Sequence, residues 1–276
     1  MLAALTAEAP ATQQAALVAS LPMYDLPALR WATDSLWAGL AERLPGAPAT
    51  LTRDRPAETI WTDPDLLLAQ ACGYPLVTTL AGKAQVVATP CYDVPGCEGP
   101  FYCSAIVVRR DDPAARLIDL YGRRAALNAD SSHSGMNAFR REIADVARGR
   151  PFFGETIATG SHAASAAAVA SGRADVAAID AVTWALLDAA DPETVLALRV
   201  LTWTRPAPGL PLISSAQTNA ERLGDLRRAL DETAVDPALA PARAALRLTG
   251  FAAAPDYGPI LDMERDAARL GYPTLA

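Results

Sequence analysis

Three short strand-like runs in the middle of the chain are each followed by a polar turn and a helical pattern. The runs are residues 124–128, 155–158 and 174–179. A strand can reach a parallel neighbour only through a crossover connection, which is usually a helix. This alternation therefore predicts an α/β fold in which mostly parallel sheets are covered by helices.

Further elements are predicted on both sides of this middle section. The expected strands of the N-terminal part are residues 16–20, 50–52, 66–70 and 84–89. Residues 89–100 are rich in proline, glycine and cysteine, and residues 206–211 are rich in proline, so both segments are suited to carry the chain between two bodies. A chain of 276 residues has room for one large domain or two small lobes.

The charge balance limits the kinds of partner. The net charge is −7 and no run of basic residues occurs, which argues against a nucleic-acid partner or an anionic membrane surface. No apolar stretch has the length of about 18 residues that a membrane span needs. No Lys or Arg precedes Arg30 and Glu8 is acidic, so the basic region of a secretory signal is absent. On these residues alone, the chain is cytoplasmic or its export signal lies upstream of this start.

The cysteines Cys72, Cys91, Cys97 and Cys103 are close together in the sequence. Zinc sites usually bring two ligands closer, as in C-x2-C, so no metal and no cofactor is expected. Buried free thiols are the favoured interpretation. If any pair is oxidised, the sequence favours Cys91 with Cys97, because they close a small loop around a Pro-Gly turn.

The turn after the first of the three runs carries the sequence D-S-S-H-S-G, residues 130–135. Serine hydroxyls and free backbone N–H groups converge at such a helix start, where the helix dipole favours negative charge. The turn is thus a candidate oxyanion cradle. The alternative is an ordinary serine N-cap, which needs only one of the three serines.

The second turn, T-G-S-H, places His162 at a helix start, and Asp180 ends the third run. Ligands of open α/β sheets lie outside the carboxyl ends of the strands, so these turns should face one crevice. A single histidine at a helix start can equally be a structural hydrogen-bonding residue. A serine hydrolase is not favoured, because no G-x-S-x-G elbow occurs, and no P-loop or G-x-G-x-x-G supports nucleotide chemistry.

Several motifs together carry a family resemblance. They are LPMYD, QACGYPL, Y-x-x-x-G-C-x-G-x-x-Y-x-S from Tyr92 to Ser104, DSSHSGMNAFR and GSHAASAAAVASGRADVAAID. The chain resembles the phosphonate-, phosphate- and phosphite-binding proteins of ABC transporters from about Ala16 to Trp203. This resemblance implies a two-lobed type II periplasmic-binding-protein fold with an anion in the cleft. Lobe one is then expected to comprise residues 1–102 and 205–276, and lobe two residues 103–204.

The resemblance also implies a set of ligand-binding residues: Ser132, His133, Ser134, His162, Asp180, Tyr24 and, as a further aromatic wall, Tyr74 or Tyr102. His133 departs from the family, which has Ser or Thr there, so its contact is expected through the backbone N–H. No acidic residue of lobe one could be matched to a ligand amine. This does not favour an aminophosphonate and leaves phosphate, phosphite or another small oxyanion.

The function expected from the resemblance is non-catalytic capture of a small phosphorus oxyanion for an ABC permease. The protein would then be periplasmic and monomeric. Two alternatives remain open at this point: a cytoplasmic ligand sensor, and an enzyme of the futalosine menaquinone type on the same fold. Fold alone does not separate these functions.

Overall fold

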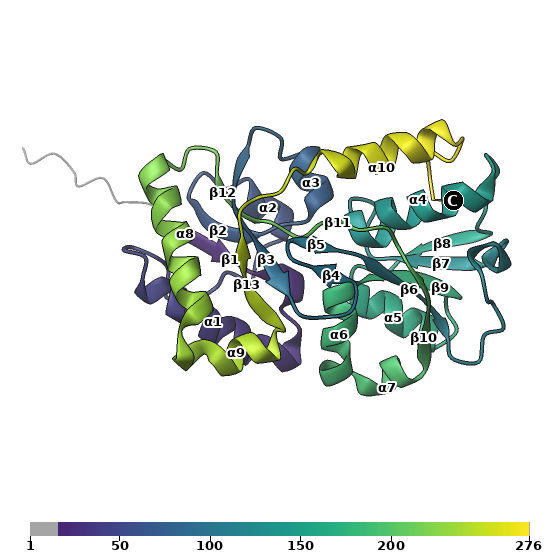
Figure 1. Cartoon of the computed structure of the whole chain (residues 1–276), viewed down its shortest axis with the longest axis horizontal. Coiled ribbons are helices and arrows are strands. Elements are labelled where there is room, and N and C mark those ends of the chain that lie inside the picture. Colours follow the sequence, from purple (N-terminus) through teal and green to yellow (C-terminus); the bar gives the residue numbers. More distant parts are fainter. Residues whose placement is uncertain (1–15, 276) are drawn as a thin grey trace, which may run out of the picture.

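Two five-stranded sheets organise the computed structural model, which describes residues 16–275 (Figure 1). The first sheet has the order β1-β2-β12-β3-β13, formed by Val18–Ser20, Leu66–Gln70, Leu212–Ser215, Ala84–Tyr92 and Leu248–Ala252. The second has the order β10-β6-β9-β7-β8, formed by Leu198–Trp203, Ser104–Arg109, Val176–Asp180, Arg124–Leu127 and Glu155–Ala158. We call the parts built around these sheets lobe one and lobe two. The predicted α/β fold is confirmed, while the residue-level boundaries of the lobes stay a prediction.

The sheets are mixed rather than mostly parallel. In lobe two, β7 runs parallel to β8 and β9, as the alternation of runs and helices predicts. However, β6, which brings the chain into this lobe, and β10, which leads it out, pair antiparallel to their neighbours. In lobe one only β1 and β2 are parallel, because β12 and β13 come from the returning half of the chain.

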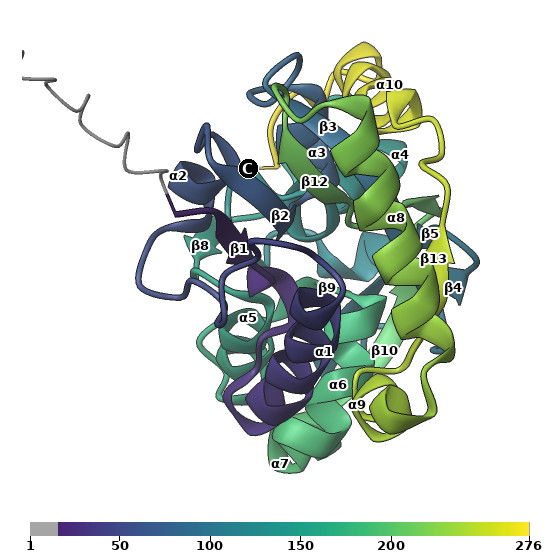
Figure 2. The ribbon, with the colours of Figure 1, turned by 90° about the vertical axis from the view of Figure 1, so that its left-hand side faces the viewer.

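Apolar faces of helices cover both sheets. In lobe one these helices are α1 (Arg30–Glu42), α2 (Ala57–Trp61), α3 (Gly73–Val77), α8 (Ala220–Val235) and α9 (Ala240–Ala245). In lobe two they are α4 (Phe139–Ala147), α5 (His162–Ala170), α6 (Ala181–Ala190) and α7 (Pro192–Leu196). Trp37 and Leu40 of α1 pack with Leu226 and Leu230 of α8 in one buried cluster of lobe one. Figure 2 shows α1, α8 and α9 together at the outer end of this lobe.

Two chain segments cross between the lobes side by side. Around them, β4 (Cys97–Glu98), β5 (Phe101–Tyr102) and β11 (Ala207–Pro208) form a small third sheet. The backbone N–H of Ser104 donates to Thr204 Oγ1 over 2.8 Å, and that of Thr204 donates to the Ser104 carbonyl over 2.9 Å. The two crossings are therefore tied to each other.

The cysteines around this crossing carry free thiols, so the Cys91–Cys97 pair suggested by the sequence is not formed. Cys91 lies in β3, where its sulfur faces the carbonyl of Thr89, whereas Cys97 lies in the separate strand β4.

The C-terminal helix α10 (Gly258–Arg269) contacts both lobes (Figure 1). It packs on α3 of lobe one and on α4 of lobe two. After it, Tyr272 and Leu275 enter the buried apolar cluster of lobe two. The chain end thus joins the lobes a third time.

One predicted strand is absent, and one observed strand was not predicted. Residues 50–52 form no strand, although Thr52 N–H still donates to the Ala19 carbonyl beside β1. Residues 248–252 form the edge strand β13, which was not predicted from the sequence. No helix within residues 16–275 is long and apolar enough to cross a membrane.

Candidate functional site

A cavity lies between the lobes and has an empty volume of about 840 Å³, part of it open to solvent. We call it the interlobe cleft. The segments around lobe one supply Pro22, Met23, Ala57, Glu58, Trp61, Cys72, Pro75 and Leu210. Lobe two supplies Asn128, Ala129, Ser131, Ser132, Ser134, Gly160, His162 and Asp180.

The serine turn forms the floor of the cleft on the side of lobe two. It follows β7 and continues as a π-helical turn, His133–Ala138, that runs directly into α4. Ser132 caps this helix, because its Oγ accepts the Gly135 N–H over 3.0 Å. The Ser134 Oγ lies 3.5 Å from the Ser132 Oγ. The two hydroxyls therefore sit next to each other at a helix start.

Two further strand-to-helix turns meet the serines. His162 is the first residue of α5, and its Nε2 lies 2.8 Å from Ser134 Oγ. The same nitrogen lies 3.5 Å from Asp180 Oδ2. Asp180 ends β9 and caps α6 by accepting the N–H and the hydroxyl of Thr183. Ser132, Ser134, His162 and Asp180 thus come together at the cleft from three turns.

The other four candidate residues are not among the residues that line the cleft. His133 is buried, and its Nδ1 lies 3.2 Å from Asn137 Nδ2, beneath the turn. Tyr102 is buried beside the His133 ring, and its hydroxyl has no hydrogen-bond partner among the described residues. Tyr74 donates to Glu264 of α10 over 2.8 Å. Tyr24 packs edge-on against Tyr92 inside lobe one.

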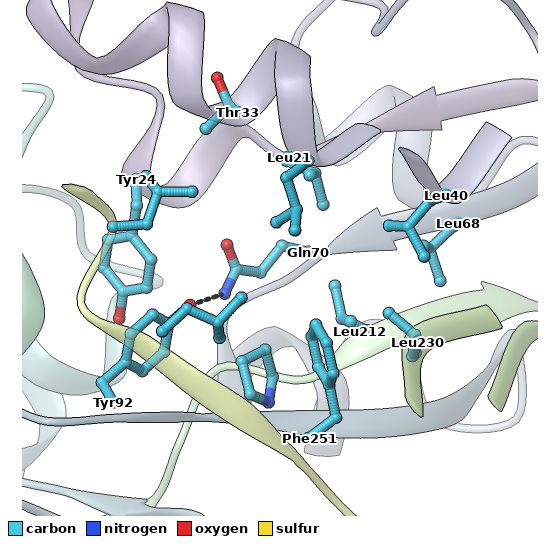
Figure 3. Close-up of a pocket in the computed structure, with 14 residues that line it drawn as sticks. Leu21, Tyr24, Thr33, Leu40, Leu68, Gln70, Tyr92, Leu212, Leu230 and Phe251 are labelled. Carbon is cyan, nitrogen blue, oxygen red and sulfur yellow. Dashed lines mark hydrogen bonds between the residues drawn. The ribbon is translucent and has the colours of Figure 1, made fainter. Parts of the chain in front are cut away.

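Tyr24 instead lines a second cavity inside lobe one, which is shown in Figure 3. Leucine side chains and Phe251 form most of its wall, and Gln70 donates to the Tyr92 hydroxyl over 3.3 Å within it. The turn Pro22–Tyr24 separates the two cavities, because Tyr24 faces the lobe-one cavity whereas Met23 faces the cleft.

Cys72, Glu58 and Asn128 are among the cleft residues that were not selected as site residues from the sequence. The Cys72 sulfur accepts the backbone N–H of His133 over 3.3 Å, a contact between the lobes. Glu58, from α2, places a carboxyl group at the cleft from lobe one. Asn128 follows β7, and its buried Oδ1 has no hydrogen-bond partner in the described part of the chain.

Burial keeps several ionisable groups of this region neutral. It lowers the pKa of His162, against the opposing effect of Asp180, and it lowers the pKa of His133 to about 3. It also raises the pKa of the Cys72 thiol and of the Tyr102 phenol well above neutral pH. At neutral pH the site therefore offers neutral imidazole, hydroxyl and thiol groups around the Asp180 carboxyl.

The buried His133 predicts a specific loss of stability in acid. Its folded-state pKa is below its usual value of 6.5, so unfolding takes up a proton between about pH 6.5 and about pH 3. The stability that this group contributes is complete above that window and falls by about 1.4 kcal/mol for each pH unit within it. In denaturant unfolding, the free energy of unfolding should thus fall by about 2 kcal/mol from about pH 7 to about pH 5, and His133→Gln should abolish this fall.

Few other groups titrate between about pH 7 and about pH 5, because the chain has only two histidines and carboxyl groups ordinarily have pKa values of about 4. His162 contributes in the same direction in both proteins. Equal changes of unfolding free energy with pH in the wild type and His133→Gln would contradict the prediction.

Comparison with known families gives a match over most of the chain. A family model described as the periplasmic substrate-binding protein of phosphonate ABC transporters matches residues 63–257, which is more than half of the sequence. No curated protein matches the chain.

Solved structures of similar fold include three bacterial proteins. A binding protein component of an ABC phosphonate transporter from Pseudomonas aeruginosa is 19% identical, with a TM-score of 0.72 over 92% of this chain and 87% of that chain. PhnD1 from Prochlorococcus marinus, in complex with methylphosphonate, is 18% identical, with a TM-score of 0.69 over 91% of this chain and 97% of that chain. XAC2383 from Xanthomonas citri, bound to a chloride ion, is 19% identical, with a TM-score of 0.68 over 92% of this chain and 98% of that chain. These similarities confirm the two-lobed type II periplasmic-binding-protein fold.

Proposed function

Because the chain belongs to the family of periplasmic substrate-binding proteins of phosphonate ABC transporters, we propose that it captures a small phosphorus oxyanion in the interlobe cleft. The ligand would be a phosphonate, phosphate or phosphite, delivered to a membrane permease without chemical change. Such a protein needs no partner other than the ligand and the permease, so we propose a monomer.

The paired hydroxyls of Ser132 and Ser134 at a helix start carry this proposal. They lie on the floor of the cleft, with His162 Nε2 2.8 Å from Ser134 Oγ. Hydroxyl groups and helix-start N–H groups bind an oxyanion through several hydrogen bonds, which are strengthened by the charge of the anion. Such a site can hold an anion even though the protein has a net charge of −7. The methylphosphonate held by PhnD1, a protein of the same fold, is a ligand of this class.

The geometry of Ser134, His162 and Asp180 also argues against a hydrolase. In a catalytic triad the serine and the carboxylate bind opposite nitrogens of the histidine, so that the ring can pass a proton. Here Nε2 of His162 lies near both Ser134 and Asp180, while Nδ1 has no hydrogen-bond partner among residues 16–275. This arrangement supports binding rather than catalysis.

Titration calorimetry with a panel of anions tests the proposal. We expect methylphosphonate, phosphite or phosphate to bind at low micromolar concentration and to raise the melting temperature, because a ligand that binds only the folded state stabilises it. Sulfate and taurine serve as controls that carry sulfur oxyanions. If none of the phosphorus oxyanions binds below millimolar concentration, the proposal is wrong.

A further inference from the structure

The lobe-one cavity is an apolar space within the core of that lobe. It has an empty volume of about 490 Å³, part of it open to solvent. Eight of its fourteen lining residues are leucines, and none of the fourteen carries a charge. Protein interiors normally leave few voids larger than a water molecule, whereas small-molecule sites are apolar spaces with a few polar groups. The cavity thus has the composition of a binding site for a small neutral molecule.

Gln70 places an amide in this apolar wall. It is the last residue of β2 and is 4% exposed. Its Nε2 donates to the Tyr92 hydroxyl over 3.3 Å, while its Oε1 accepts no hydrogen bond from residues 16–275. Figure 3 shows the amide beside Tyr24 and Tyr92, with Leu68 and Leu230 farther away. The cavity therefore has a polar end with an unpaired acceptor and an apolar end.

The Tyr92 hydroxyl completes the polar end. It accepts from Gln70, and its own proton has no acceptor among the described residues. Burial raises the pKa of this phenol, so the proton stays in place at neutral pH. A group that accepts from Tyr92 and donates to Gln70 Oε1 would give both atoms a partner. A hydroxyl group can do both.

Phe251 stands between the cavity and the surface. Phe251 and Leu230 line the cavity and also line a pocket at α8 and β13 that includes Arg227 and Asp231. β13 is an edge strand of its sheet, and Phe251 is half-buried. Local opening costs less free energy at such a site than in the core of a sheet. A rotation of the Phe251 side chain would therefore give a ligand an entrance to the cavity.

From these features we propose that lobe one binds a small, uncharged aliphatic alcohol in this cavity. The hydroxyl of the alcohol donates to Gln70 Oε1 and accepts from Tyr92, and its alkyl chain contacts the leucines. A charged head group is rejected, because the burial of a charge without a partner is costly. The cavity shares no lining residue with the interlobe cleft, so this site goes beyond the proposed function.

Two isomers, 1-pentanol and butyl methyl ether, form a matched pair for the test, because only the alcohol can donate a hydrogen bond. In NMR titrations we expect 1-pentanol to shift the methyl signals of Leu68, Leu212 and Leu230 saturably, with a dissociation constant of about 1 mM or lower. The methyl signals of Leu187, in the core of lobe two, should not shift. The ether should bind at least about tenfold more weakly, because it leaves Gln70 Oε1 without a donor.

Gln70→Leu tests the polar end of the cavity. The variant loses the acceptor but keeps an apolar side chain of similar length among the leucines, so it should still melt cooperatively. The alcohol and the ether should bind to it with nearly equal affinity, because both can still accept from Tyr92. Gln217→Leu is the matched control, because Gln217 is exposed and lies outside the cavity lining. This control should keep the wild-type preference for the alcohol.

Phe251→Ala tests the entrance. Without the ring, 1-pentanol should leave the cavity at least about tenfold faster, as measured by exchange in the same spectra. Phe101→Ala is the control, because Phe101 is 41% exposed but lies on β5, outside the cavity lining. Its release rate should equal that of the wild type.

Three results would overturn the inference: no saturable shift of the three leucine methyl signals, ether binding within tenfold of 1-pentanol in the wild type, or an unchanged preference in a cooperatively melting Gln70→Leu variant. Saturable binding of pentanoate, which is charged at neutral pH, would contradict the uncharged ligand class. An unchanged release rate in Phe251→Ala would reject the entrance. Oxyanion binding enters none of these measurements, so their outcome is independent of the proposed function.

Discussion

The double variant Ser132→Ala/Ser134→Ala is expected to fold and to lose about 100-fold or more of its affinity for the best phosphorus oxyanion. The loss of each hydroxyl removes a hydrogen bond to the anion, which is worth about 1.5–3 kcal/mol. Each 1.4 kcal/mol corresponds to about a tenfold change in affinity. The effect on stability should be smaller. Ser132 contributes one cap bond, to the Gly135 N–H, and the loss of a cap costs about 0.5–2 kcal/mol.

Calorimetry and melting with and without ligand check both parts of this prediction. At 100 times its dissociation constant, a ligand stabilises the wild type by about 2.7 kcal/mol, and the same concentration should leave the double variant nearly unchanged. Asn219→Ala is the control, because Asn219 caps α8 in lobe one, away from the cleft lining. Asn219→Ala should lower the stability of the protein and leave its affinity for the oxyanion unchanged. Wild-type affinity in the double variant would reject the serine cradle and with it most of the transport proposal.

Much of lobe two could be predicted from the sequence because its signals are local. The runs that form β7, β8 and β9 are short, and each is followed by a turn and a helical pattern, so these elements can be recognised from nearby residues alone. Strand β13 was missed because it is an edge strand with Gly250 at its centre, and its pairing with β3 joins segments far apart in the chain.

The candidate site also contains residues that could be predicted from the sequence and residues that could not. Ser132, His162 and Asp180 could be placed at one crevice because each follows a strand of the same sheet, and the structure has all three in the cleft lining. Cys72 and Glu58 depend on how lobe one sits against lobe two, which no local pattern encodes. The backbone passes close to the serine turn at Tyr74 and Tyr102. However, the Tyr74 side chain points to α10, and the Tyr102 side chain points to the His133 ring.

Gly135 stands at the closest approach within the site, and its replacement by alanine predicts a large loss of binding. A Cβ at this position would lie 2.0 Å from Asn128 Oδ1 and 3.1 Å from the His162 Cε1 atom. The Asn128 amide would have to swing away, and the His162 ring would have to shift. Displacements of about 1 Å in a positioned site can cost on the order of 100-fold, so we expect Gly135→Ala to lose affinity of that order.

The control for this variant is Gly224→Ala in α8, where a Cβ meets no atom within 4 Å. Alanine in place of glycine inside a helix stabilises by about 0.5–1 kcal/mol when it fits, so Gly224→Ala should melt higher and bind normally. Adding Asn128→Ala to Gly135→Ala removes the overlap with the amide. We expect the double variant to regain thermal stability but not affinity, because the Asn128 side chain no longer lines the cleft and the His162 ring is still displaced. Normal binding by Gly135→Ala alone would mean that Asn128 and His162 do not position the ligand.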